Sequence, residues 1–187
     1  MEDELTIIER AKTNPQDFKP LYQKYFNDVF RFVLSRTGDI ELTKDLVSDV
    51  FCKVLQALPN YTYQSPSGFK AWLFKIAYTT TMEFFRKQKK EVSITVDETD
   101  FNRFINEIAE KNSSSENNKE QLKKQLLEAL QQLNPNDLQL LELRFFDNLS
   151  YAEIAQITEK TETNVKTKTF RLLKKLQSEI LKTYNHG

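Results

Sequence analysis

The chain of 187 residues has few of the residues that interrupt helices, with only 3 glycines and 5 prolines. Such a composition favours long helices. The single cysteine, Cys52, excludes an internal disulfide and a cysteine-based zinc cluster, and it is expected to lie in the core. The sequence therefore predicts an all-α protein of a reducing compartment, with no metal or other cofactor.

Long hydrophobic runs are also missing, since no apolar stretch approaches the roughly 20 residues that a membrane span needs. The acidic start, residues 1–5, does not have the form of a secretory signal. These absences predict a cytoplasmic protein without a membrane span. The formal net charge is zero but unevenly distributed: residues 1–90 carry +3, residues 91–118 carry −5 and residues 119–187 carry +2.

Residues 148–176 have the pattern of two amphipathic helices joined by a short turn. Ser150 and Glu153 have the spacing of a capping box, which fixes the start of the first helix. Thr161 is expected to cap the second helix, so the turn falls at about residues 159–161. Two helices joined by so short a turn cross steeply, as in a helix-turn-helix that places its second helix in the major groove of DNA.

The second of these helices has two faces of different chemistry. The inward face is apolar apart from one threonine and consists of Val165, Thr169, Leu172, Leu173, Leu176 and Ile180. The outward face can contact phosphates and base edges and consists of Thr163, Lys166, Thr167, Phe170, Arg171 and Lys174. The alternative is a helical hairpin with a solvated lysine face, but an exposed phenylalanine argues against it.

The N-terminal half begins with a short predicted helix at residues 4–12, a break at residues 14–15 and a dense apolar series at helical spacing from Phe18 to Val33. This series is interpreted as core. Pro20 must lie in the first turn of its helix or kink it, and Gly38 is expected to cap the end of that helix in the left-handed conformation.

The predicted helix at residues 40–58 buries one side and leaves Asp45, Ser48 and Asp49 on another. Asp45 and Asp49 lie one turn apart and repel each other, so a compensating partner would relieve them. A metal site or an acid-base pair is one alternative, but no histidine or second carboxylate-bearing helix lies nearby in sequence. A basic protein surface is the favoured partner.

A loop at residues 59–68 and a predicted helix at residues 69–90 combine aromatic and basic side chains. The basic edge consists of Lys70, Lys75, Arg86, Lys87, Lys89 and Lys90. Residues 79–81 are three threonines whose hydroxyls could contact a nucleic-acid strand, and Tyr61, Tyr63 and Tyr78 could stack on exposed bases. For each tyrosine, a place at the rim of the core is the alternative.

These motifs resemble the extracytoplasmic-function (ECF) group of bacterial RNA polymerase sigma factors, in the sigma-70 family. DLVSDVF at residues 45–51 resembles the polymerase-binding motif of region 2.2, and AWLFKIA at residues 71–77 resembles the start of region 2.4. LNPNDLQLLELRFFDNLSYAEIAQ at residues 133–156 is similar to region 4. The resemblance implies two helical domains, residues 1–90 as region 2 and residues 119–187 as region 4, joined by a linker at residues 91–118.

The resemblance also implies roles for particular residues. Asp45, Ser48 and Asp49 correspond to positions that bind the clamp helices of the polymerase β′ subunit. The minus-10 element would be contacted by Tyr63, Lys75, Thr79, Glu83, Arg86 and Lys87. The minus-35 element would be contacted by Thr163, Lys166, Thr167, Phe170, Arg171 and Lys174. The family usually has Gln at the position of Ser48 and Asn at that of Thr79, and a threonine cannot reproduce the paired donor and acceptor of an amide.

The acidic linker is expected to be flexible, and Phe104 lies among apolar residues that could form a helix docking elsewhere. Two roles remain open: a nucleic-acid mimic in the polymerase channel or a plain tether. The predicted function is a transcription initiation factor without enzymatic activity or cofactor. Its predicted partners are core polymerase (β′ clamp helices and β flap), promoter DNA and an anti-sigma factor. The alternatives are a stand-alone helix-turn-helix regulator and a decoy that titrates an inhibitor.

Overall fold

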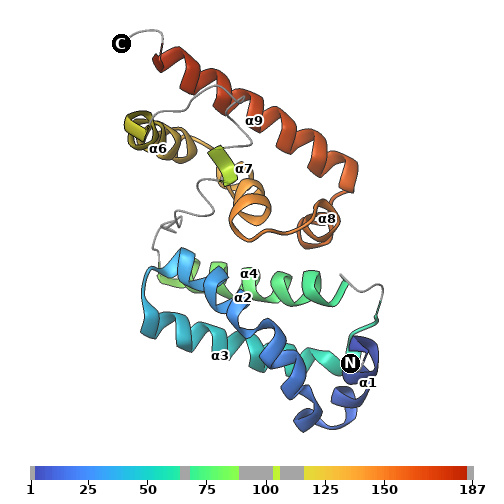
Figure 1. Cartoon of the computed structure of the whole chain (residues 1–187). Helices are drawn as coiled ribbons and strands as arrows, with labels where there is room; N and C mark the ends of the chain where they lie inside the picture. The colour runs from blue at the N-terminus through green and yellow to red at the C-terminus, as the bar shows by residue number, and fades with distance from the viewer. Residues whose placement is uncertain (1–2, 64–67, 89–102, 106–115, 185–187) are drawn as a thin grey trace. The chain divides into compact units, whose positions relative to one another are not determined.

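The computed structural model describes residues 3–63, 68–88, 103–105 and 116–184, and these residues form helices joined by turns, with no strand among them (Figure 1). The chain divides into two compact units, Met1–Thr95 and Val96–Gly187. The predicted all-α class is confirmed. Within the described residues, no helix has both the length and the apolar character needed to cross a bilayer.

The first unit packs three long helices against one another and adds a short N-terminal helix. Helix α2 contacts α3, α3 contacts α4, and α2 also contacts α4. Its elements in chain order are α1 (Glu4–Thr13), the 3-10 turn η1 (Pro15–Phe18), α2 (Lys19–Thr37), α3 (Ile40–Ala57), the 3-10 turn η2 (Leu58–Asn60) and α4 (Gly68–Gln88).

The boundaries of α2 and α3 follow from local sequence. Pro20 lies in the first turn of α2, where its missing N–H removes no helical hydrogen bond. Gly38 adopts φ 62° and its N–H donates to the carbonyl of Leu34 at 2.9 Å, as expected for a C-terminal glycine cap. Asp39 then caps α3, with its carboxylate accepting from the N–H of Leu42 at 3.0 Å. One glycine and one aspartate therefore separate two long helices cleanly.

Aromatic rings dominate the core of the first unit. Phe32 and Phe74 meet edge to face at 5.3 Å between ring centroids, which joins α2 to α4. The guanidinium of Arg36 is buried and stacks 3.7 Å from the centroid of the Phe32 ring, and it also donates to the carbonyl of Phe32 at 2.8 Å. Helix α1 is held to α2 by Glu4, whose carboxylate accepts from the Tyr25 hydroxyl at 2.8 Å.

The second unit is built around its last helix. Helices α6 (Glu116–Gln131), α7 (Pro135–Leu141) and α8 (Tyr151–Thr158) each contact α9 (Glu162–Tyr184). Between α7 and α8 the chain forms a π-helical turn, η3 (Glu142–Phe146). Asp137 at the start of α7 forms an ion pair with Lys168 of α9, which fixes α7 against the last helix.

A short stretch of the acidic middle belongs to this second unit. Phe104 is fully buried, with its ring centroid 4.7 Å from that of Phe145 and 5.6 Å from that of Phe146. Arg103 also donates to the carbonyl of Phe145 at 3.4 Å. The segment therefore packs on η3. Most of the predicted linker, residues 91–102 and 106–115, lies outside the described residues. Its predicted flexibility is therefore not tested by the structure.

Candidate functional site

Helix α3 carries an acidic surface opposite its buried face. Asp45, Ser48 and Asp49 are exposed, whereas Leu46 and Val50 are buried in the core. The nearby Lys44 pairs with Glu41 of its own helix at 2.6 Å. Among the described residues, no basic side chain pairs with either aspartate. Two adjacent carboxylates without a counter-ion suit a basic protein surface.

Cys52 lies on the exposed side of the same helix, so the expectation that it belongs to the core is wrong. Its neighbour Phe51 is buried and makes the ring contacts that the apolar pattern of the helix requires. A cysteine is compatible with either side of an amphipathic helix, and the sequence did not distinguish the two. The described residues hold no group of three or more side chains suited to bind a metal.

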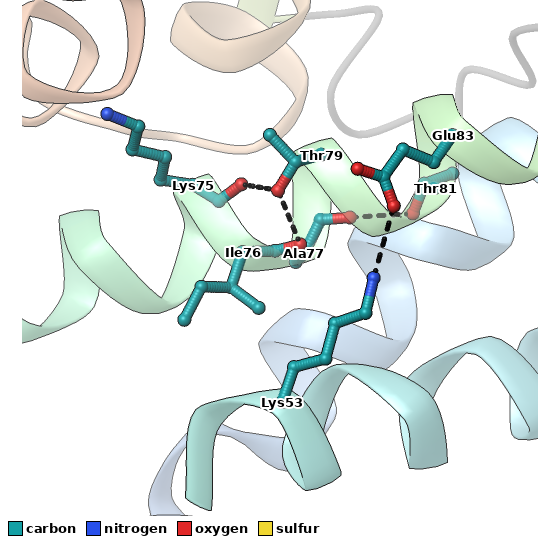
Figure 2. A network of polar contacts seen from close by, with 7 residues as sticks. All are labelled: Lys53, Lys75, Ile76, Ala77, Thr79, Thr81 and Glu83. Carbon is teal, nitrogen blue, oxygen red and sulfur yellow. Dashed lines mark hydrogen bonds and ion pairs between the residues drawn. The ribbon is translucent and has the colours of Figure 1, made fainter. Parts of the chain in front are cut away.

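Helix α4 presents a mixed basic surface toward its C-terminal end. Thr79, Arg86 and Lys87 are exposed, and Lys75 and Glu83 are partly exposed. The carboxylate of Glu83 accepts from the ammonium of Lys53 at 3.2 Å, an ion pair that joins α4 to α3 (Figure 2). Sequence reasoning had not connected this lysine to the basic surface, since the two residues lie far apart in the chain.

The hydroxyl of Thr79 bonds to its own helix. Its Oγ1 donates to the carbonyl of Lys75 at 2.7 Å and lies 3.1 Å from that of Ile76 (Figure 2). Ser48 does the same on α3, donating to the carbonyl of Lys44 at 2.8 Å. At both positions the proton of the side chain is already used, which leaves the lone pairs of the oxygen to accept hydrogen bonds.

The other two threonines of the run do not face solvent. Thr80 is buried, and Thr81 is buried with its hydroxyl donating to the carbonyl of Ala77 at 2.8 Å (Figure 2). The expectation that all three hydroxyls could contact a strand is therefore wrong for these two. Consecutive residues of a helix point in different directions, so only Thr79 of the run lies on the exposed side.

Tyr61 is likewise part of the core and cannot stack on a base. Only 8% of its surface is exposed, and its ring lies 4.6 Å from that of Trp72 and 5.6 Å from that of Phe69. Burial, with smaller effects from Tyr63 and Glu4, raises the pKa of the Tyr61 hydroxyl to about 12. Tyr63 and Tyr78 are partly exposed, so they remain candidates for stacking.

The predicted helix-turn-helix is formed by α8 and α9. Ser150 and Glu153 form the full capping box, with the Ser150 side chain accepting from the N–H of Glu153 at 3.2 Å and the Glu153 carboxylate accepting from the N–H of Ser150 at 2.7 Å. Glu159 ends α8 in the left-handed conformation, at φ 56°. Thr161 then accepts from the N–H of Asn164 at 3.2 Å, as its predicted capping role requires.

The outward face of α9 matches the pattern expected from sequence. Phe170 is 61% exposed, with the ammonium of Lys174 5.7 Å from its ring centroid. Lys166 pairs with Glu162 at 2.8 Å. The exposed residues of this face are Thr163, Lys166, Thr167, Phe170, Arg171 and Lys174. The buried ones are Val165, Thr169, Leu172, Leu176 and Ile180. Leu173, which was also expected to face inward, is partly exposed.

Two residues that the sequence analysis did not single out lie beside this face. The guanidinium of Arg144 in η3 is 4.7 Å from the ring centroid of Tyr151, and the ammonium of Lys166 is 5.9 Å from the same ring. Arg144 also donates to the carbonyl of Leu149 at 3.1 Å. The ring of Tyr151 thus brings an arginine of the π-helical turn close to the cations of α9. The π-helical turn that places Arg144 has no signal in the sequence.

Comparison with known proteins assigns both halves of the chain. Residues 21–91 match the model of sigma-70 region 2, and residues 123–176 match that of sigma-70 region 4. The chain is 31% identical over 167 residues to the ECF RNA polymerase sigma factor SigM of Bacillus subtilis (strain 168), covering 89% of this chain and 94% of that protein.

Two solved structures have a similar fold. The structure of CnrH in complex with the cytosolic domain of CnrY matches with a TM-score of 0.61 at 15% identity, covering 95% of this chain and 96% of CnrH. The sigma factor RpoE in complex with the anti-sigma factor NepR, from Bartonella quintana, matches with a TM-score of 0.55 at 19% identity. The match covers 89% of this chain and 98% of the matched chain. The chain therefore belongs to the ECF group of the sigma-70 family, and it is a transcription initiation factor that directs RNA polymerase to specific promoters.

Proposed function

We propose that the functions of this sigma factor are divided among three exposed surfaces. The acidic surface of α3, formed by Asp45, Ser48 and Asp49, would bind the clamp helices of the polymerase β′ subunit. The mixed surface of α4, together with Tyr63, would hold the separated minus-10 strand. The outward face of α9 would bind the minus-35 duplex. Residues 1–90 and 119–187 would carry these tasks as two domains, joined by residues 91–118, of which the stretch around Phe104 packs on η3 of the second unit.

The observation that carries the proposal is the separation of charge between exposed helix faces. The exposed carboxylates of Asp45 and Asp49 on α3 are not paired with any described basic residue, whereas the exposed face of α9 is mainly cationic and surrounds an exposed phenylalanine. Anionic DNA favours the second surface and would be repelled by the first. A basic protein surface is the complementary partner for the first.

Strand separation explains why the factor would need polymerase. Opening DNA removes stacking of about 1.4 kcal/mol per base step, so several opened steps cost more than a few side-chain contacts can offset alone. Contacts of polymerase with the same strand would supply the difference. The protein would thus perform no catalytic chemistry of its own. It would act in the bacterial cytoplasm, where polymerase is found.

Two further partners are part of the proposal. The second unit would contact the β flap of polymerase, and an anti-sigma factor would hold the protein inactive. Support for the latter comes from RpoE, a protein of similar fold that was solved in complex with an anti-sigma factor. A stand-alone helix-turn-helix regulator is less favoured, because it would have no use for the acidic surface of α3.

Run-off transcription with purified core polymerase on a promoter library tests the proposal. We expect transcripts from a small set of templates that share two short elements, and no stable opening of the same templates by the protein alone. Failure of the purified protein to associate with core polymerase would overturn the proposal. Binding to duplex promoters with equal strength in the presence and absence of polymerase would instead favour the stand-alone regulator.

A further inference from the structure

The ion pair between Lys53 and Glu83 connects two surfaces that the proposed function treats separately. Lys53 belongs to α3, one turn after Asp49, and Glu83 belongs to α4, one turn after Thr79. Their side chains meet at 3.2 Å, and each is 46% exposed (Figure 2). Lys53 could pair with Asp49 on its own helix, but in the structure its ammonium lies against the other helix.

Glu83 is unusual for a surface that would hold a nucleic-acid strand. It carries a negative charge beside the exposed cations Arg86 and Lys87. An isolated carboxylate at such a place would repel phosphates and weaken binding. The ammonium of Lys53 neutralises this charge from the neighbouring helix. The carboxylate can therefore contact a base without repelling the phosphates of the strand.

Only one oxygen of the carboxylate is occupied. Lys53 donates to Oε2 of Glu83, and Oε1 has no hydrogen-bond partner among the described residues. A carboxylate oxygen accepts hydrogen bonds and cannot donate them. Facing an unpaired base, it would favour one with an exocyclic amine, as carboxylates do when they accept from N4 of cytosine.

We propose that Glu83 selects a base with an exocyclic amine (cytosine, adenine or guanine) over thymine in the separated minus-10 strand, and that Lys53 is the positioning residue that orients its carboxylate. This inference rests on the proposed function, because it requires α4 to hold that strand. The lone pairs of the Thr79 hydroxyl lie one turn away on the same exposed side, and they add an acceptor of the same kind.

Selection from a randomised pool tests the inference. The full chain, bound to core polymerase, is incubated with single-stranded oligonucleotides carrying a randomised minus-10 segment, and bound molecules are sequenced. We expect the unmodified protein to discriminate against thymine at one position, in favour of the three bases that carry an exocyclic amine. Glu83→Gln should reduce this preference by about fivefold, because an amide can donate as well as accept and so discriminates less. Lys53→Met should reduce the preference at the same position.

Two controls separate positioning from general charge. Lys44 is a lysine of the same helix that pairs with Glu41 of its own helix, so Lys44→Met removes one charge from α3 without touching Glu83. It should leave the base preference unchanged. The exchange Lys53→Glu with Glu83→Lys keeps an ion pair but places a donor on α4. We expect it not to restore the preference, whereas a purely structural ion pair would be restored by it.

The inference and the proposed function fail in different ways. If the unmodified complex shows a base preference that Lys53→Met and Glu83→Gln both leave intact, the inference alone is wrong. A uniform loss of binding to all sequences in both variants would also overturn it, since that result indicates general electrostatics. If the unmodified protein neither joins polymerase nor retains any strand, the proposed function fails and the inference with it.

Discussion

Helices α3 and α9 are built in the same way but present opposite charges. Each buries an apolar stripe against its own unit, Val47, Val50 and Val54 on α3 and Val165, Leu172 and Leu176 on α9. On the exposed side, α3 carries a pair of aspartates and α9 a group of lysines and an arginine. The buried stripes determine how each helix packs, while the exposed residues determine what each helix can bind. One helical architecture therefore supports two different partners.

Reversing the charge of the α3 surface should have the largest effect on binding. Asp45→Arg with Asp49→Arg places two cations where a basic partner is expected, and like-charge contacts across an interface cost several kcal/mol. We expect association with core polymerase to fall at least about 100-fold in a pull-down or titration. Circular dichroism should be unchanged because both residues are exposed. If the double variant binds core polymerase with unchanged affinity, these residues do not belong to the polymerase interface.

The two sides of α9 can be separated by a matched pair of truncations. Leu176→Ala removes a fully buried side chain, so we expect it to lower the free energy of unfolding by about 2–5 kcal/mol. Phe170→Ala removes an exposed ring and should change that free energy by no more than about 0.5 kcal/mol. Below the melting temperature, Phe170→Ala should weaken promoter binding more than Leu176→Ala does. Equal effects of both changes on stability would contradict the assignment of the two sides.

Single cations of α9 should have smaller effects, which depend on salt. Lys166→Ala and Arg171→Ala are each expected to weaken duplex promoter binding about tenfold, and each should lower the slope of log affinity against log salt by about 1 if it removes a phosphate contact. Fluorescence titrations between low and moderate salt measure both quantities. Loss of affinity for one base pair only, without a change in slope, would indicate a base contact instead.

The smallest expected effect concerns the pH dependence of the second unit. Burial raises the pKa of the Asp137 carboxyl, but hydrogen bonds from Lys168 and Asn134, with the charges of Lys168 and Lys175, lower it below its ordinary value of 3.8. A carboxyl with a lowered pKa in the folded state stabilises the fold above its unfolded pKa, and this stabilisation is lost as the pH falls through the folded value.

Thermal unfolding should therefore show a melting temperature that falls below about pH 5, and less steeply in Asp137→Asn. A parallel fall in both proteins would assign the acid sensitivity to other carboxyl groups.

Local signals in the sequence predicted much of the fold. Gly38, Ser150 and Thr161 each mark a helix boundary through contacts with residues at most four positions away, so their roles follow from spacing alone. Periodicity likewise identified the exposed side of α9, because side chains three and four positions apart share one side of a helix.

The failures concern contacts between distant segments. Thr80 and Cys52 were assigned to the wrong environment, and the sequence left open whether Tyr61 stacks on bases or lies at the core, since burial depends on which helix packs against which. The pair of Lys53 and Glu83 spans 30 positions and joins two helices, so no spacing rule connects them. The residue roles at the three surfaces remain predictions, and the variants above test them.

The burial of Phe104 determines where a stable C-terminal fragment of this protein should begin. A C-terminal fragment that starts at residue 119, where the composition changes, would omit this ring and uncover the side chains of Phe145 and Phe146. Such a fragment should be prone to self-association through the uncovered aromatic surface. A fragment that starts before Arg103 retains Phe104, which covers Phe145 and Phe146, and is the better choice for study in isolation.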